Sequence, residues 1–336
     1  MNRPVVAVTL GDASGIGPEL VAKLLVRRQA IAAAQIVVAG DAWVLADGER
    51  VAGVTSPIQV IHDWTEARRG DGTPMFLEVE TVAKGNIVPG QVTAAAGRGA
   101  RLALTACLEA AARGDIDAIC FAPLNKQAMK EGGMHFEDEL HFFADWFGVT
   151  DYFCEFNTLG TLWTSRISSH IPLAEVPRYI LEDRIKAAAR LTFETLKRAG
   201  FAAPRVAVAA LNPHGGDGGT CGREEIDVIA PAARALNAEG LPIQGPYPAD
   251  TIFLKARDGL LDAIVTMYHD QGQVAIKLMG FERGVTVQGG LPVPITTPAH
   301  GTAFDIVGQG KANAEAMTQA LLLAAKMGAA RRGQTI

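Results

Sequence analysis

The sequence has little positive charge, little cysteine and no long apolar run, and each shortage excludes a class of protein. Lysine and arginine number 31 against 36 acidic residues, for a net charge of −5, so a nucleic-acid-binding surface is not expected. The four cysteines form no Cys-x-x-Cys pair, which favours buried thiols over disulfides or cysteine metal ligands. No run approaches the roughly 20 apolar residues of a membrane span. The first residues lead directly into a strand pattern without a signal peptide, so we expect a cytoplasmic protein.

The common nucleotide-binding motifs are also missing. The segment 11–19 (Gly-Asp-Ala-Ser-Gly-Ile-Gly-Pro-Glu) follows an apolar run, but its spacing is neither that of the Rossmann fingerprint nor that of a P-loop. One interpretation is a tight turn between a strand and a helix. The other is a loop at a cleft in which Asp12 or Glu19 faces a ligand.

Apolar, strand-like runs alternate with amphipathic helical runs along most of the chain, which is typical of an α/β fold with a largely parallel sheet. A chain of 336 residues exceeds what one hydrophobic core usually serves, so we expect two lobes. The predicted strands include 5–10, 36–39 and 118–121, and the predicted helices include 20–28, 91–113, 181–199, 223–237 and 313–326. Residues 136–163 are rich in aromatic side chains and are left unassigned.

Three of the seven histidines follow strand-like runs. His170 follows 164–169, His214 follows 206–211, and His269 follows 263–267. Neutral imidazole is the commonest protein ligand for zinc, and three histidines with one open position make a catalytic metal site. One histidine in a turn is usually an ordinary hydrogen-bonded residue, but three after three strands favour a shared divalent-metal site.

Other polar residues near these histidines are candidates for supporting roles. Asp217, Asp250 and Asp270 are candidates for carboxylates that fix the imidazole tautomers. Lys277 lies in an apolar setting and is either a surface lysine with a buried stem or a group that holds substrate or transfers a proton. The segment 300–313 is either a simple capped loop or a loop suited to the adenosine end of a dinucleotide.

Together these segments resemble the 4-hydroxythreonine-4-phosphate dehydrogenase (PdxA) family. The similar motifs occur in order from residue 5 to about residue 330. They are 11–19, 122–126 (Ala-Pro-Leu-Asn-Lys), 211–219, 248–253 (Pro-Ala-Asp-Thr-Ile-Phe), 268–272 (Tyr-His-Asp-Gln-Gly) and 300–312. The segment 300–313 is also similar to the cofactor loop of isopropylmalate and isocitrate dehydrogenases.

The resemblance implies a two-lobed α/β/α fold of the isocitrate/isopropylmalate dehydrogenase type. It implies a terminal, cofactor-side lobe of 1–130 plus 290–336 and a central lobe of 131–289 with the metal ligands and the dimer interface. The family's metal ligands correspond to His170, His214 and His269, and its substrate lysine to Lys277. It further implies a homodimer with the active site at the interface, and NAD bound outside a Rossmann fold.

The chain departs from the family at the phosphate pocket. The family's Gly-His-Thr-Glu is replaced by 138–141 (Asp-Glu-Leu-His), so that its histidine and threonine become Glu139 and Leu140. The substrate-binding asparagine and arginine become Thr286 and Ile295. A phosphate needs cationic and N–H or O–H donors, and these exchanges remove donors and add a negative charge.

We therefore expect an NAD-dependent, divalent-metal-dependent dehydrogenase of a secondary alcohol that bears a nearby carboxylate, with decarboxylation if the product is a β-keto acid. Lys277 and Asp250 are the expected catalytic residues, and Gly301, Thr302 and Asp305 the expected cofactor contacts. NADP is an alternative to NAD, and Zn, Mg, Co and Mn are all candidate metals.

The altered pocket favours a non-phosphorylated substrate, such as a cis-dihydrodiol carboxylate. The alternative substrate is 4-hydroxythreonine 4-phosphate, in pyridoxal phosphate synthesis. An alternative of another class is a two-lobed ligand-binding protein without catalysis.

Overall fold

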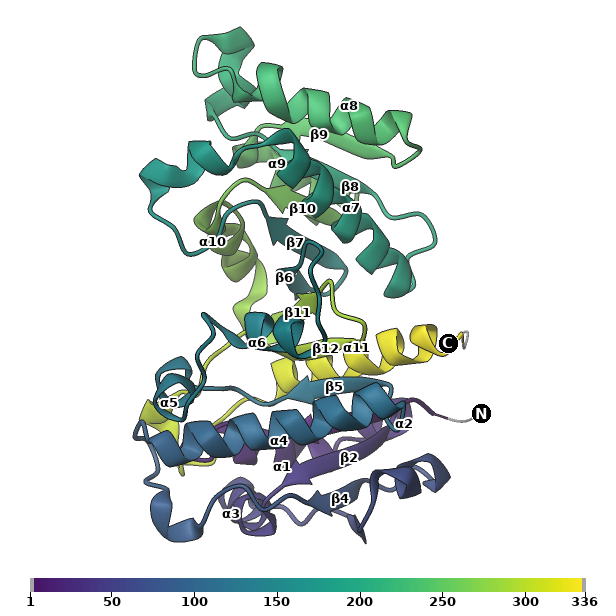
Figure 1. The fold of residues 1–336 in the computed structure, drawn as a ribbon, viewed down its shortest axis with the longest axis vertical. Coiled ribbons are helices and arrows are strands. Elements are labelled where there is room, and N and C mark those ends of the chain that lie inside the picture. The colour runs from purple at the N-terminus through teal and green to yellow at the C-terminus, as the bar shows by residue number, and fades with distance from the viewer. Residues whose placement is uncertain (1–2, 334–336) are drawn as a thin grey trace. The chain divides into compact units, whose positions relative to one another are not determined.

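The computed structural model describes residues 3–333, and the chain divides into two compact units (Figure 1). The first unit contains the chain up to Val149, Val285–Val287 and the chain from Leu291 onward, and the second contains Thr150–Gly284 and Gln288–Gly290. The segment 131–149, which the sequence-based division assigned to the central lobe, belongs with the first unit. The reason is packing: the ring of Phe143 contacts that of Phe121 edge-on, with centroids 5.9 Å apart.

A mostly parallel sheet forms the centre of the first unit. Its strand order is β3-β4-β2-β1-β5-β12-β11, in which β11 and β12 pair antiparallel and the other described pairs are parallel. The strands are β1 (Val5–Thr9), β2 (Gln35–Gly40), β3 (Gln59–Ile61), β4 (Met75–Glu78), β5 (Ala118–Phe121), β11 (Val285–Gly289) and β12 (Ile295–Pro298). Strands β1, β2 and β5 are buried along their whole length, which explains their continuous apolar runs.

Helices cover both faces of this sheet. Helix α4 packs on one face, and α11 with α1 packs on the other (Figure 1). The helices are α1 (Gly17–Leu25), α2 (Arg28–Ala33), α3 (Ala42–Ala52), α4 (Ala94–Arg113), α5 (Lys126–Glu131), α6 (Glu139–Trp146) and α11 (Glu315–Arg331), with short 3₁₀ turns η1 (Trp64–Arg69), η2 (Lys84–Asn86) and η7 (Phe304–Ile306). The ends of α4 have local causes, because the Thr93 hydroxyl accepts the Ala96 N–H at its start and Gly114 takes a left-handed conformation at its end.

The second unit is a smaller layered structure with strand order β6-β7-β10-β8-β9. Its strands are β6 (Cys154–Leu159), β7 (Leu162–Arg166), β8 (Val206–Ala209), β9 (Ile243–Tyr247) and β10 (Ala263–Thr266). Its helical segments are η3 (Leu173–Tyr179), α7 (Glu182–Arg198), η4 (Pro213–Gly219), the π-helix η5 (Glu225–Ile229), α8 (Ala230–Ala238), α9 (Ala249–Arg257), α10 (His269–Gly280) and η6 (Phe281–Arg283). Helices α9 and α10 share a buried apolar cluster with Ala207, Ala209 and Ile264 of the sheet.

The predicted α/β class is confirmed. The predicted helix 20–28 begins earlier, at Gly17 with Pro18 in its first turn, and ends at Leu25, before α2 begins at Arg28. The unassigned segment 136–163 contains α6 and most of the antiparallel pair of β6 and β7. Among residues 3–333, no helix combines the length and the apolar character needed to cross a bilayer.

The cysteines are free thiols, as expected, but their environments differ. Cys107 and Cys120 are buried, whereas Cys221 is exposed. Burial raises the pKa of Cys120 to about 12, so this thiol is protonated and unreactive at neutral pH.

Candidate functional site

Three neighbouring parallel strands of the second unit end at the same edge of its sheet. Strand β10 lies between β7 and β8, with Thr266 opposite Arg166 and Val265 opposite Val208. His170, His214 and His269 each follow one of these strand ends within a few residues. The carboxyl edge of a parallel sheet is where α/β proteins place their ligands.

Two of these histidines lie side by side. The ring centroids of His170 and His269 are 5.6 Å apart. The Nδ1 atom of His269 lies 2.7 Å from an Asp270 carboxylate oxygen, so Nε2 is the ring nitrogen that faces away from this contact. A carboxylate on the second nitrogen is typical of metal-binding histidines, because it fixes the tautomer and the ring orientation.

His214 lies in an unusual left-handed turn. All residues from His214 to Gly218 have positive φ, including 54° at His214 and 44° at Asp217. This conformation costs roughly 1–3 kcal/mol for each non-glycine residue and is concentrated at functional sites. The described residues include no group of ligand atoms, all within 4.8 Å of one another, that joins His214 to His170 and His269.

A buried carboxylate holds the start of this turn. Glu225 is 3% exposed, and its Oε1 accepts the backbone N–H groups of Leu211 and Asn212, both at 2.8 Å. Gly216 has φ 83°, and a Cβ there would lie 2.8 Å from the Gly222 carbonyl oxygen and 2.7 Å from Glu225 Oε2, so the turn favours glycine at this position. Sequence reasoning missed Glu225, and no motif around it gives a signal.

Side chains also connect the three strand ends. The Met267 N–H donates to Gln271 Oε1 (2.7 Å), and the Gln271 Nε2 donates to the Ala210 carbonyl (2.8 Å), which joins α10 to the end of β8. The Ser168 hydroxyl donates to the Met267 carbonyl at 2.9 Å, which joins the loop after β7 to the same point. Sequence reasoning singled out the motif that contains Gln271 but assigned this side chain no role.

The predicted catalytic residues lie on neighbouring helices of this unit. Lys277 is exposed, about two turns beyond His269 on α10. Asp250 is exposed in the first turn of α9, and Asp217 is exposed in the left-handed turn.

In the first unit, the predicted cofactor loop packs against the turn after β1. The Ile16 N–H donates to the Thr302 carbonyl at 3.1 Å, and a Cβ at Gly15 would lie only 2.9 Å from that of Thr302. Of the three predicted cofactor contacts, Thr302 is buried, whereas Gly301 and Asp305 are exposed.

A partly buried ion pair fixes the far end of this loop. Lys23 Nζ donates to the Glu19 carboxylate (2.7 Å) and to the carbonyls of Gly310 (2.9 Å) and Ala312 (2.8 Å). Glu19 also accepts the Ala312 N–H at 2.9 Å. Glu19 therefore anchors the loop through its Oε1 atom. The Glu19 Oε2 atom is buried without a hydrogen-bond partner among the described residues.

The other acidic residue of this turn is Asp12, whose carboxyl group has a raised pKa. Asp12 is 1% exposed, and one carboxylate oxygen accepts the Ser14 N–H at 2.8 Å. The other oxygen is buried without a hydrogen-bond partner in the described part of the chain. Burial outweighs the hydrogen bonds from Ser14 and raises the pKa of Asp12 to about 6.

The predicted substrate positions Glu139, Leu140, Thr286 and Ile295 all belong to the first unit. Leu140 is 3% exposed and Ile295 is 0% exposed, so both are core side chains without donors. Thr286 is buried on β11 opposite Thr297, and Glu139 is half-buried at the first residue of α6.

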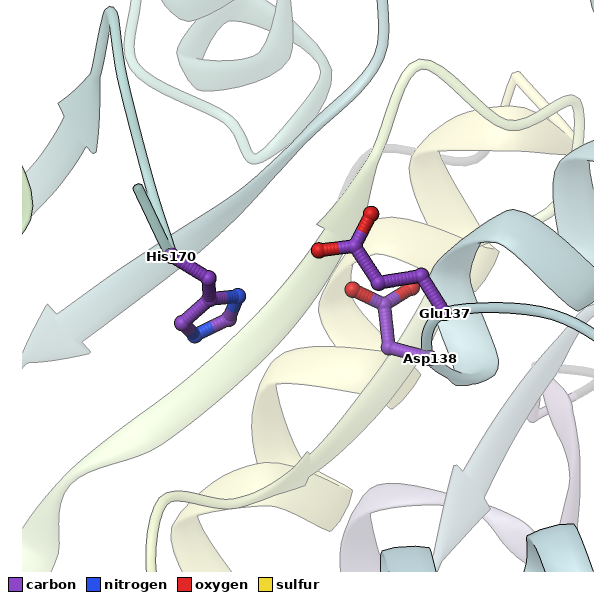
Figure 2. Close-up of side chains that lie close together, drawn as sticks. All are labelled: Glu137, Asp138 and His170. Carbon is purple, nitrogen blue, oxygen red and sulfur yellow. The ribbon is translucent and has the colours of Figure 1, made fainter. Parts of the chain in front are cut away.

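The start of α6 carries a compact hydrogen-bonded pair. Asp138 accepts the His141 N–H at 3.0 Å and contacts His141 Nδ1 at 2.7 Å. Burial opposes ionisation of Asp138, but these bonds prevail and hold its pKa below the usual value. Figure 2 shows Glu137 and Asp138 at the amino end of α6, and His170 in the loop that leaves β7.

Comparisons with known proteins identify the family to which this sequence is similar. The profile of the family described as "Pyridoxal phosphate biosynthetic protein PdxA" matches residues 32–324. A Pseudomonas aeruginosa protein provisionally named 4-hydroxythreonine-4-phosphate dehydrogenase 2 is 48% identical over 97% of this chain and 98% of its own length. A Symbiobacterium thermophilum protein, provisionally named D-threonate 4-phosphate dehydrogenase, is 36% identical over 98% of both chains.

Solved structures show the same fold. The crystal structure of 4-hydroxythreonine-4-phosphate dehydrogenase from Klebsiella pneumoniae has a TM-score of 0.84, with 34% identity over 97% of this chain and 98% of that one. A terephthalate 1,2-cis-dihydrodiol dehydrogenase from Burkholderia xenovorans is less similar, with a TM-score of 0.65 and 29% identity over 94% of this chain and 98% of that one. The chain therefore belongs to the PdxA family of dehydrogenases.

Proposed function

We propose that the protein oxidises a secondary alcohol of a phosphorylated four-carbon hydroxy acid, with NAD as the hydride acceptor and a divalent metal at the histidines. The substrate is of the kind that its relatives are named for, 4-hydroxythreonine 4-phosphate or D-threonate 4-phosphate. The observation that carries the proposal is the gathering of three histidine-bearing segments at one edge of parallel strands, in a chain of this family.

The donor set fits a divalent metal. His170 and His269 have adjacent rings, and the Asp270 carboxylate beside Nδ1 would fix the tautomer of His269. His170, His214 and His269 would hold the ion, and zinc suits an all-imidazole set, with Mg, Co or Mn as alternatives. When bound, such an ion lowers the pKa of the substrate hydroxyl and polarises the carbonyl that forms.

The chain's own residues would perform the remaining steps. Lys277 would hold the substrate carboxylate or transfer the hydroxyl proton, and Asp250 would support it. The loop with Gly301, Thr302 and Asp305 would hold NAD or NADP, and its hydrogen bonds to the turn after β1 and to Lys23 of α1 would keep it in place. We further propose a homodimeric, cytoplasmic enzyme that acts on small molecules, and decarboxylation of the product where oxidation yields a β-keto acid.

A second candidate is a non-phosphorylated substrate such as a cis-dihydrodiol carboxylate. The observation that favours it is the residue type at positions 140 and 295, since leucine and isoleucine offer no donor to a phosphate. The names of the more similar relatives favour the phosphorylated substrate, and the dihydrodiol dehydrogenase is a more distant match.

Turnover of matched substrates tests the proposal. The purified protein with NAD and Zn²⁺ or Mg²⁺ would be assayed with 4-hydroxythreonine 4-phosphate, D-threonate 4-phosphate, their dephosphorylated forms and a cis-dihydrodiol carboxylate. We expect a higher kcat/KM for one of the phosphorylated compounds. Turnover of the dihydrodiol alone would replace the first candidate with the second.

Thermal unfolding separates an enzyme from a ligand-binding protein without catalysis. A cofactor that binds the folded chain raises Tm by mass action, so NAD with metal should raise it. The absence of any shift with NAD or NADP, together with no turnover, would favour the non-catalytic alternative.

A further inference from the structure

Arg166 is a buried cation whose hydrogen bonds connect several segments of the second unit. It is the last residue of β7 and is only 8% exposed. Its Nε donates to the Ser169 hydroxyl (2.9 Å), its Nη1 to Asn157 Oδ1 (2.7 Å) and its Nη2 to a Glu155 oxygen (2.8 Å). Burial of a charge is costly unless it is paired, and Glu155, whose side chain is 16% exposed, supplies the counter-charge.

These hydrogen bonds connect Arg166 to the segments that carry the two adjacent histidines, His170 and His269. Ser169, which accepts the Nε bond, directly precedes His170 in the chain. Asn157 Oδ1, which accepts the Nη1 bond, also accepts a hydrogen bond from Gln273 Nε2. Gln273 lies on α10 one turn beyond His269, so one guanidinium connects the loop of His170 to the helix of His269.

The geometry of the side chain suits this role. A guanidinium is planar and presents its donors in fixed directions, so three acceptors held by it are fixed relative to one another. A lysine at this position would keep the charge but could not reach three acceptors in these directions. The short antiparallel pair of β6 and β7 brings Asn157 opposite Thr164, which places Glu155 and Asn157 beside the end of β7.

We propose that Arg166 is a positioning residue that sets the separation of the His170 and His269 rings, and thereby the affinity of the site for a divalent metal. This proposal rests on the metal-dependent function proposed above. Arg166 would touch neither metal nor substrate and would act through Ser169, Asn157 and Gln273.

A second arginine of the same unit provides a matched control. Arg205 directly precedes β8, and its Nε and Nη2 pair with Asp262, which directly precedes β10, at 3.0 and 2.7 Å. Arg205 therefore forms an arginine–carboxylate pair, more exposed than that of Arg166, at the amino edge of the strands whose carboxyl ends lead to His214 and His269. Its loss should affect stability without affecting metal binding.

The test is Co²⁺ binding to the full-length protein, followed by the visible absorption of the ion and by calorimetry. Loss of a residue that orients metal ligands typically weakens metal affinity by about 10–100-fold, and we expect this for Arg166→Met, together with an altered Co²⁺ spectrum. Arg166→Lys should recover part of the stability and little of the affinity. Arg205→Met should lower Tm while its Co²⁺ dissociation constant and spectrum stay those of the wild type.

Gln273→Leu keeps the buried ion pair and removes only the connection to α10. This variant keeps the proposal testable if Arg166→Met does not fold. We expect its Co²⁺ dissociation constant to rise several-fold. If the folded variants at positions 166 and 273 bind Co²⁺ as the wild type does, the positioning role is refuted and the proposed function stands. If the wild type binds no divalent metal, both proposals are refuted.

Discussion

The two units of the molecule stabilise their strand-end loops by different means. In the first unit, the turn after β1 contacts the loop 300–312 mainly through backbone groups and glycine, and the partly buried pair of Lys23 and Glu19 holds the far end of the loop. In the second unit, the three strand ends are joined by the side chains of Arg166, Gln271 and Ser168.

This difference matches the ligands that we propose for each unit. Backbone contact and glycine leave room for a large cofactor to approach the chain closely. A metal ion instead needs a few imidazoles held at fixed separations, which requires bonds to the neighbouring side chains. The two sets of residues should therefore be separable by mutation, and the predictions below test this from the largest expected effect to the smallest.

Substitution of a metal-site histidine should have the largest effect. His214→Ala or His269→Ala should remove bound metal and lower kcat/KM by more than about 100-fold, because the Lewis acid is lost. NAD binding, measured by calorimetry, should change little, because the cofactor loop lies in the other unit. Full metal content in both variants would contradict the ligand assignment.

Asp12 should make stability depend on pH. Its folded-state pKa of about 6 exceeds the ordinary value of 3.8, so the folded state binds more protons than the unfolded state between these values. The contribution of Asp12 to the free energy of unfolding is therefore fully present below about pH 4 and is lost as the pH rises through about 6. The loss amounts to at most about 3 kcal/mol, at 1.36 kcal/mol per pKa unit.

Denaturant unfolding of wild type and Asp12→Asn between pH 4 and 7 measures this contribution, since the variant should not show the decline. Asp71→Asn is a control, because hydrogen bonds from Thr73 lower the pKa of the exposed Asp71 and should give a small change of opposite sign. Parallel pH profiles for wild type and Asp12→Asn would contradict the raised pKa of the buried Asp12.

Lys23→Met should weaken cofactor binding and leave metal binding unchanged. The variant loses two bonds to the loop 300–312 and leaves the 3%-exposed Glu19 without its partner. We expect a loss of stability of about 2 kcal/mol and a roughly tenfold rise in the NAD dissociation constant. An unchanged NAD affinity in a folded Lys23→Met protein would show that the ion pair does not position the loop. As a control, Lys23→Arg should retain most of the wild-type NAD affinity.

Glu139→Gln should have the smallest effect. If the substrate is phosphorylated and its phosphate lies near α6, removal of the negative charge should lower KM a few-fold, and more at low salt. The dephosphorylated compound is the control, since its KM should not change. Equal effects on both compounds would place the phosphate elsewhere.

The sequence predicted β1, β2 and β5 of the first unit, because buried parallel strands are continuous apolar runs. It did not predict α6 or the antiparallel pair of β6 and β7. There the aromatic residues have no clear period, and packing of rings such as Phe143 on Phe121 determines the structure.

The candidate site shows the same division. The position of the three histidines after strand ends could be predicted, because a strand end is a local feature of the sequence; that they share a metal remains a prediction. Arg166 and Glu225 could not be predicted, because their partners lie at distances along the chain that no local pattern encodes.

The sequence by itself determined the α/β class, the family and the residue types available for chemistry, since these follow from periodicity and from ordered motifs. Only the tertiary structure decided that His170 and His269 are neighbours, that Leu140 and Ile295 belong to the core, and that Glu19 anchors a loop almost 300 residues away. These facts depend on which strands pair and on what each side chain meets, and both are set by packing over the whole chain.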